Sequence, residues 1–306
     1  MIGLAVTAAA VLLQGGAAPN PLMLHFDGMR EGSARLQMNE MLDLRTGREA
    51  SVDDLVRAAV GKPFVFLGEE HDCPEHHVMQ AKVIDALAAS GRNVIVGFEM
   101  LTRPKQDCLA PWAMGAWDEA KFLEESDWQH QWGMPFSLYR PIFEVIRKRH
   151  LRAVALNVPR PWVHSVATGG YEALSAEDRA DLPKELYLGD ADHKAIFDAM
   201  MGGHPMPPGM GDHLYAAQVL WDEGMADTAI KYLAHETVTP ETVFVVVAGS
   251  GHVMYGRGIN FRIRRRTGMD GVTLVMTDST GPVEVSRAIG DFAYLSRSPI
   301  RSQGSE

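Results

Sequence analysis

Short apolar runs alternate with amphipathic stretches along most of the chain. Runs rich in valine, isoleucine and phenylalanine predict buried strands at residues 63–67, 93–98, 153–156, 243–248 and 272–276. The stretches between them repeat apolar residues every three or four positions, which is the spacing of an amphipathic helix. Because strands alternate with helices, the pattern predicts an α/β fold in which a mostly parallel central sheet is flanked by helices.

Four polar residues precede amphipathic stretches and are predicted to cap helices: Ser51, Asp72, Ser137 and Asp212. A side-chain oxygen at such a position accepts a hydrogen bond from an N–H group that has no partner within the helix. The helix that starts at Asp212 should run to about Leu233.

Residues 165–212 interrupt the strand–helix order with short helical stretches and a loop rich in glycine and proline, which predicts a helical insertion or lid. The segment after Gly281 is a candidate edge strand. We expect residues 20–300 to form one domain and residues 301–306 to form a flexible tail.

The first residues predict export of the protein. An alanine-rich apolar run at residues 2–13 is too short to span a bilayer but fits the apolar part of a signal peptide, and small residues follow it. No Lys or Arg precedes the run, so the basic start of a signal peptide is missing. We predict a signal peptide at residues 1–19, and the lack of a cysteine after the run argues against a lipoprotein anchor.

Composition narrows the function classes. The chain has 306 residues and a formal net charge of -10, which argues against nucleic acid as a partner because phosphate binding needs a basic surface. Two cysteines exclude a structural zinc site made of cysteines alone, which needs four.

Polar and titratable residues follow four predicted strands, and parallel sheets bind their ligands at this edge. These residues are Glu70, His71, Glu99, Asn157, Arg160 and His252. Two predicted helices add His76, Gln80 and Asp222, whereas His77 is expected to face solvent. Each residue alone has an ordinary explanation as a hydrogen-bonded polar group near a core. Their agreement at four strand ends favours a common site.

We predict Glu70, His71, Glu99 and His252 as the catalytic set. Two histidines and two carboxylates can hold a divalent metal, with His71, His252 and Glu99 as ligands and a carboxylate left as general base. The same residues can perform acid–base chemistry without a metal. A serine hydrolase is poorly supported because Ser250 lacks the Gly-x-Ser-x-Gly turn.

The motifs resemble those of the ChaN-like haem-binding proteins, in a superfamily with Tiki proteases and erythromycin esterases. The resemblance covers roughly residues 62–265 and lies in residues 67–72, 76–80, 97–100, 139–141, 155–160, 217–226 and 249–253. It adds Tyr139, Arg140 and Gln218 to the predicted ligand pocket.

The resemblance implies a haem-binding protein of an exported iron-acquisition system, periplasmic or associated with the outer membrane. Its expected partners are haem and other iron-uptake components, and a homodimer is one candidate assembly. The alternative that it implies is a metal-dependent hydrolase, either an esterase or a peptidase. Haem iron accepts tyrosine or histidine, so the candidate haem ligands are Tyr187, Tyr215, Tyr255, His204 and His213.

Overall fold

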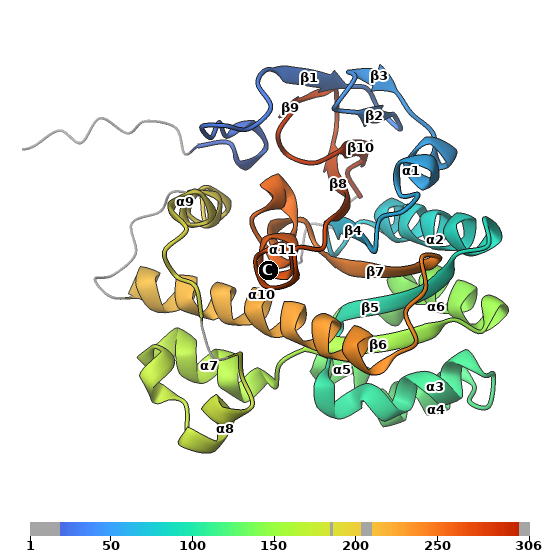
Figure 1. The fold of residues 1–306 in the computed structure, drawn as a ribbon, viewed down its shortest axis with the longest axis vertical. Helices are drawn as coiled ribbons and strands as arrows, with labels where there is room; N and C mark the ends of the chain where they lie inside the picture. Colours follow the sequence, from blue (N-terminus) through green and yellow to red (C-terminus); the bar gives the residue numbers. More distant parts are fainter. Residues whose placement is uncertain (1–18, 184–185, 203–209, 300–306) are drawn as a thin grey trace, which may run out of the picture.

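The computed structural model describes residues 19–183, 186–202 and 210–299 (Figure 1). The predicted signal peptide, up to residue 18, and the predicted tail at 301–306 lie outside these residues, as does His204. Within the described residues, the central sheet has eight strands in the order β3-β2-β10-β8-β4-β7-β5-β6. Their bounds are β2 Met41–Asp43, β3 Arg48–Glu49, β4 Phe64–Glu69, β5 Asn93–Thr102, β6 Arg152–Asn157, β7 Thr242–Gly249, β8 Gly271–Ser279 and β10 Phe292–Arg297.

The sheet is mostly parallel, as predicted. The strands from β10 to β6 run parallel to their neighbours, whereas β2 and β3 add an antiparallel edge. The five predicted strands correspond to β4, β5, β6, β7 and β8.

The segment after Gly281 forms two strands, and the prediction of an edge strand there is wrong. β9 (Val283–Ser286) pairs with β1 (Ser33–Leu36) in a separate two-stranded sheet. β10 lies inside the central sheet, between β8 and β2. The sequence pattern could not show this because a three-residue strand such as β2 is too short to give a recognisable pattern.

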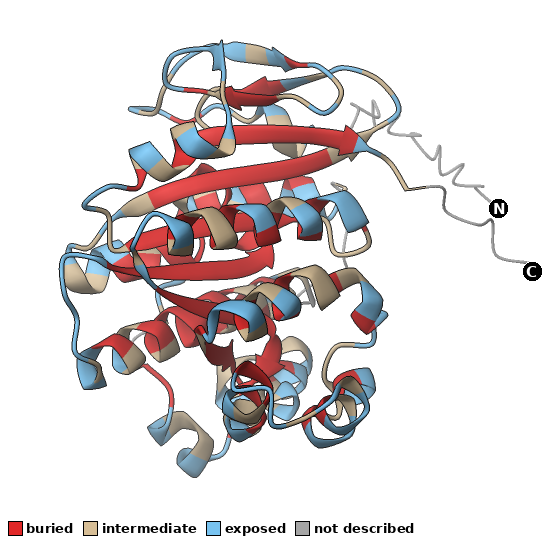
Figure 2. Ribbon diagram, turned by 90° about the vertical axis from the view of Figure 1, so that its right-hand side faces the viewer, coloured by how far each residue is buried: buried red, intermediate tan, exposed pale blue. Residues whose placement is uncertain are grey.

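Helices cover both faces of the sheet (Figures 1 and 2). Alternate residues of a strand point to opposite faces, so Val65 and Leu67 pack in one core and Phe64 and Phe66 in the other. The first core includes residues of α1 (Val52–Ala58), α2 (Pro74–Ala89), α3 (Leu109–Ala113) and α6 (Phe136–Arg149). The second includes residues of α10 (Met210–His235) and α11 (Ile259–Thr267).

The predicted insertion is helical. It contains the second half of α7 (Arg160–Gly169), together with α8 (Ala176–Ala180) and α9 (Ala191–Met200), before α10 begins. Its role as a lid stays a prediction. The stretch between α3 and α6 contains Trp117, Trp128 and Trp132 and forms α4 (Glu119–Ser126) and α5 (Trp128–Gln131). Among the described residues, no helix is long and apolar enough to cross a membrane.

The predicted helix caps are only partly correct. Ser51 caps α1 and forms a capping box with Asp54. The N-cap of α2 is Cys73 rather than Asp72, and its side chain makes no capping hydrogen bond. The N-cap of α6 is Pro135, and Ser137 lies inside the helix.

Gly258 allows the loop that carries His252 to fold back closely on itself. A Cβ atom at Gly258 would lie 1.8 Å from the main-chain oxygen of His252, far inside van der Waals contact. The side-chain amide of Asn260 closes the same loop by donating a hydrogen bond of 2.7 Å to the main-chain oxygen of Val253.

We therefore predict that Gly258→Ala lowers the free energy of unfolding by about 1–3 kcal/mol or more, because overpacking usually costs this amount. Urea unfolding followed by circular dichroism measures this change. Gly281→Ala is the matched control, because a Cβ atom there meets no atom within 4 Å. Equal stability of the two variants would contradict the close approach at Gly258.

Candidate functional site

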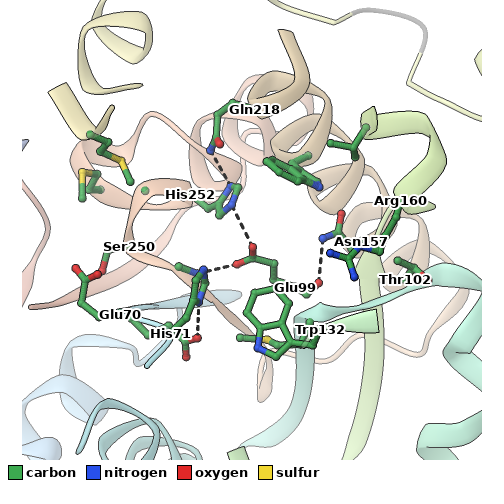
Figure 3. A pocket seen from close by; sticks show the side chains of 18 of the residues that line it. Glu70, His71, Glu99, Thr102, Trp132, Asn157, Arg160, Gln218, Ser250 and His252 are labelled. Carbon is green, nitrogen blue, oxygen red and sulfur yellow. Dashed lines mark hydrogen bonds and ion pairs between the residues drawn. The ribbon is translucent and has the colours of Figure 1, made fainter. Parts of the chain in front are cut away.

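The carboxyl ends of β4, β5 and β7 meet at one edge of the sheet and form the floor of a cavity of about 850 Å³. Charged groups on the floor include Glu69, His71, Glu99 and His252. Figure 3 shows the side chains of His71, Glu99 and His252 next to one another at its centre.

Glu69, the last residue of β4, is a site residue that the sequence analysis missed. Its side chain is fully buried. Its Oε1 accepts hydrogen bonds from the Tyr139 hydroxyl at 2.8 Å and from His71 Nδ1 at 2.9 Å, and its Oε2 lies 3.0 Å from His77 Nδ1. Burial favours the neutral acid, but His77 and His71 outweigh it and lower the pKa of Glu69 to about 2.

A signal for Glu69 was present in the strand pattern. Val65, Leu67 and Glu69 are two residues apart and therefore share one face of β4. That face packs against α2 and α6, which carry His77 and Tyr139. A carboxylate at the end of an otherwise apolar row must find partners there.

His71 presents its imidazole to the cavity. Its Nδ1 is held by Glu69, its ring lies beside Glu99 (Figure 3), and the Trp132 ring meets it edge-on at 4.7 Å. The side chain is 34% exposed, whereas that of Glu69 is fully buried. Burial lowers the pKa of His71, but the hydrogen bond with Glu69 and the charge of Glu99 raise it more, so its net shift is upward.

His252 lies between two buried carboxylates. Its Nε2 is 3.3 Å from Glu99 Oε1, and its Nδ1 is 2.6 Å from Asp222 Oδ1. The other oxygen of Glu99 accepts a hydrogen bond of 2.7 Å from the main-chain N–H of Gly249. Burial favours neutral imidazole, but Glu99 and Asp222 together raise the pKa of His252 to about 10. His252 is therefore an imidazolium at neutral pH.

The charged row continues into the helices beyond the cavity. Asp222 Oδ2 on α10 lies 3.0 Å from His193 Nε2 on α9, and His193 Nδ1 lies 3.1 Å from the Tyr215 hydroxyl. The guanidinium of Arg262, fully buried on α11, is 3.8 Å from the same oxygen of Asp222. In space, six side chains follow one another in the order Glu69, His71, Glu99, His252, Asp222 and His193. We call them the alternating row, because carboxylates and imidazoles alternate along it.

Glu70 lies apart from the other three predicted catalytic residues. It lines the cavity on the side of Ser250 (Figure 3). Burial and the charge of Asp278 raise the pKa of Glu70 to about 7. Glu69, rather than Glu70, contacts His71.

His76 and Gln80, two predicted pocket residues, lie behind the floor and do not line the cavity. His76 Nδ1 accepts a hydrogen bond of 2.9 Å from the main-chain N–H of Glu70, and its Nε2 lies 3.1 Å from the Ser296 hydroxyl. Burial lowers the pKa of His76 to about 4. The amide of Gln80 donates to the main-chain oxygen of Leu67 at 3.2 Å.

Two other sequence-based assignments differ from the structure. His77 does not face solvent: its side chain is fully buried, because one ring nitrogen contacts Glu69 and the other lies 3.1 Å from the main-chain oxygen of His71. Arg140 does not line the cavity and forms a hydrogen-bonded ion pair of 2.6 Å with Glu119.

Asn157, Arg160 and Gln218 line the cavity wall, where they were predicted. The Asn157 amide donates to the main-chain oxygen of Glu99 at 3.0 Å, which ties β6 to β5 beside the floor. Trp132 and His164 also line the cavity and were missed. Four-residue spacing from Arg160 along α7 could have indicated His164.

The described haem-ligand candidates lie outside the cavity lining. Tyr215 and Tyr255 are buried, and their hydroxyl groups are hydrogen-bonded, that of Tyr255 to the main chain at Pro21 and Leu24. Burial raises the pKa of Tyr255 to about 12, which disfavours the tyrosinate that would bind iron. Tyr187 is 38% exposed at the surface, and His213 lies against Gly170.

The predicted divalent-metal site is not supported. Within the described ranges, no group of three or more His, Cys, Asp or Glu residues is arranged to hold a metal ion. Both ring nitrogens of His252 are directed at carboxylates, whereas only Nδ1 of His71 is held by one.

We predict that His252→Gln lowers the free energy of unfolding by about 3–5 kcal/mol near pH 6, because it removes the cation that lies between the buried carboxylates of Glu99 and Asp222. The folded-state pKa of about 10 exceeds the ordinary value of 6.5. The contribution of His252 is therefore complete below pH 6.5 and is lost as the pH rises through 10. Denaturant unfolding from pH 6 to pH 10 should show that the difference in the free energy of unfolding between wild type and variant becomes smaller. His130→Gln is the control, because His130 is exposed beside Asp127. A difference in the free energy of unfolding that does not change with pH would contradict the prediction.

Comparisons with known proteins found solved structures that are similar to this chain. ChaN of Campylobacter jejuni, solved with cofacially bound haem, is 20% identical, with a TM-score of 0.64 over 83% of this chain and 95% of that chain. An erythromycin esterase variant, EreC, is 13% identical over 79% of this chain and 77% of its own, with a TM-score of 0.45. No curated protein matches the sequence.

The match to ChaN of Campylobacter jejuni establishes a shared fold, and the more distant likeness to the esterase carries no functional argument. A family model described as "Haem-binding uptake, Tiki superfamily, ChaN" matches residues 55–263, which include both β4 and β7 and every residue of the alternating row. The chain belongs to this ChaN family of haem-binding uptake proteins in the Tiki superfamily.

Proposed function

We propose that this protein binds haem in the cavity above the alternating row. The observation that carries the proposal is the lining of the cavity, which combines large apolar side chains with polar groups held in place by the protein, as ligand sites do. Trp132, Trp221, Met100, Met200 and Met254 supply the apolar surface. The cavity volume of about 850 Å³ lies in the range of cofactor sites.

We propose His71 as the residue that binds the haem iron. Its imidazole lines the cavity and is oriented by the carboxylate of Glu69, an arrangement that fixes the ring and raises its basicity in metal sites. An imidazole must lose its proton before it binds a metal. Because the pKa of His71 is raised, haem affinity should increase with pH.

Hemin titration tests this proposal. The wild-type protein should show a shifted Soret band that saturates, and His71→Ala should weaken haem binding about tenfold or more. Tyr187→Phe is the control, because Tyr187 is the exposed tyrosine among the candidates and lies outside the cavity lining. A flat wild-type titration would exclude haem binding, and loss of binding in Tyr187→Phe alone would move the site to the surface.

Haem binding of this kind would serve an exported iron-acquisition system. Support comes from the family, whose description is haem-binding uptake. Fractionation of cells that express the full chain, followed by immunoblotting, tests the location. A periplasmic or membrane-associated protein is expected, and retention in the cytoplasm would contradict the proposal.

A second candidate function is hydrolysis. The observation that favours it is the pair formed by Glu69 and His71, because a carboxylate that orients a cavity-facing imidazole is typical of general acid–base catalysis. The residues need no metal for such a step. Assays of the purified protein with a chromogenic ester, repeated with His71→Ala, test it. Hydrolysis that survives in His71→Ala would exclude this assignment.

A further inference from the structure

The described residues form a second cavity, of about 470 Å³, which shares no lining residue with the first. Its walls come from α11, the start of β8, the residue before β4 and the segments before β1 and β10. Four basic and two acidic side chains line it: Arg30, Arg45, Lys62 and Arg264, with Asp270 and Asp291. Because the whole chain has a net charge of -10, this excess of positive charge is local to the cavity.

Arg264 brings to this cavity a cation that the protein does not neutralise. Within the described ranges, its side chain has neither a hydrogen bond nor an ion pair. The other three arginines of α11 differ from it. Arg262, Arg265 and Arg266 each lie within ion-pair distance of the carboxylate of Glu223. The donors of Arg264 therefore remain available to a ligand, whereas those of its neighbours are used to hold α11 against α10.

Arg30 reaches the same cavity from the segment before β1. Its Nη1 donates hydrogen bonds to the main-chain oxygens of Arg287 at 2.6 Å and Gly290 at 2.9 Å. The carboxylate of Asp291 lies 3.8 Å from its Nη2, which is too far for a hydrogen bond, and Oδ2 of Asp291 accepts instead from the main-chain N–H of Thr273 at 3.0 Å. Arg30 is thus oriented by neutral groups and keeps donors for a ligand.

The other two cations of the cavity are already paired. Arg45 donates two hydrogen bonds, of 2.9 Å and 2.8 Å, to the carboxylate of Asp43, which does not line the cavity. Lys62 lies 3.5 Å from Asp270, and both side chains of this pair are exposed. Because exposed ion pairs contribute little free energy, the Lys62 ammonium can turn to a ligand of higher charge at low cost. Arg30 and Arg264 are therefore the main expected contacts, with Lys62 as a third.

We infer that this second cavity binds a small organic phosphate. A phosphate monoester carries about two negative charges at neutral pH and three terminal oxygens, so it can accept hydrogen bonds from several cations at once. The planar fork of an arginine matches two of these oxygens. Met29, Phe66 and Val272 offer apolar surface to the organic part, and a volume of about 470 Å³ suits a small molecule. The inference does not depend on the proposed haem function, because the two cavities have no residue in common.

Calorimetric titration of the full chain with phenyl phosphate, in a phosphate-free buffer of low ionic strength, tests the inference. Wild type should bind phenyl phosphate more tightly than benzoate or inorganic phosphate, because neither of these combines a dianion with an apolar group. Arg264→Gln and Arg30→Gln should each weaken binding of phenyl phosphate about fivefold, as suits a partly exposed ion pair. Arg48→Gln is the matched control, because Arg48 is exposed on β3 and does not line the cavity.

Four results would overturn the inference. The first is a wild-type chain that does not bind phenyl phosphate. The second is equal affinity for phenyl phosphate and benzoate, which would show that the phosphate group is not recognised. The third is equal affinity for phenyl phosphate and inorganic phosphate, which would show that the organic part makes no contact. The fourth is the same loss in Arg264→Gln and Arg48→Gln, which would show only a general attraction between charges. Arg264→Gln keeps the test independent of folding, because it removes no contact between described residues.

Discussion

The structure around the cavity depends on the burial of three carboxylates, Glu69, Glu99 and Asp222, with imidazoles between them. A buried carboxylate without a partner would be protonated or would destabilise the fold. His71, His252 and Arg262 supply the compensating charge: His71 contacts Glu69, Arg262 lies beside Asp222, and His252 contacts both Glu99 and Asp222, which come from different elements. Because these groups come from β4, β5, α10 and the loop after β7, none of those elements can shift without separating a charge from its partner. The row therefore fixes the strand ends and the helix that covers them as one unit.

This arrangement gives the cavity a floor whose charged groups are paired within the protein and a rim that keeps hydrogen-bond donors without a partner among the described residues. On the floor, each charge is already paired within the protein, so a ligand gains little by displacing those contacts. His71 is the exception, because a third of its side chain is exposed to the cavity. At the rim, Arg160 retains donors that no described residue uses. The proposed haem site uses this division, because the proposed iron contact is at the open imidazole of the floor.

The ChaN family assignment and this geometry answer different questions. The family model and the match to ChaN of Campylobacter jejuni concern the chain as a whole and its fold. At 20% identity, few side chains are shared, so the ligand contacts have to be argued from this chain's own residues. The tyrosines predicted from the resemblance illustrate the point. Tyr215 and Tyr255 use their hydroxyl groups to hold α9 and the N-terminal segment in place, and they do not face the cavity.

The sequence by itself determined the strands, the parallel arrangement of most of them and the convergence of His71, Glu99 and His252. Apolar runs mark buried strands, and parallel strands bring their carboxyl ends to one edge whatever the details of packing. Only the tertiary structure decided that Glu69 rather than Glu70 holds His71. It also decided that His193 extends the alternating row. These outcomes depend on which helix packs on which face of the sheet: α2 and α6 bury the side chain of Glu69, and α9 brings His193 to Asp222. Such packing between distant segments cannot be read from a local pattern in the chain.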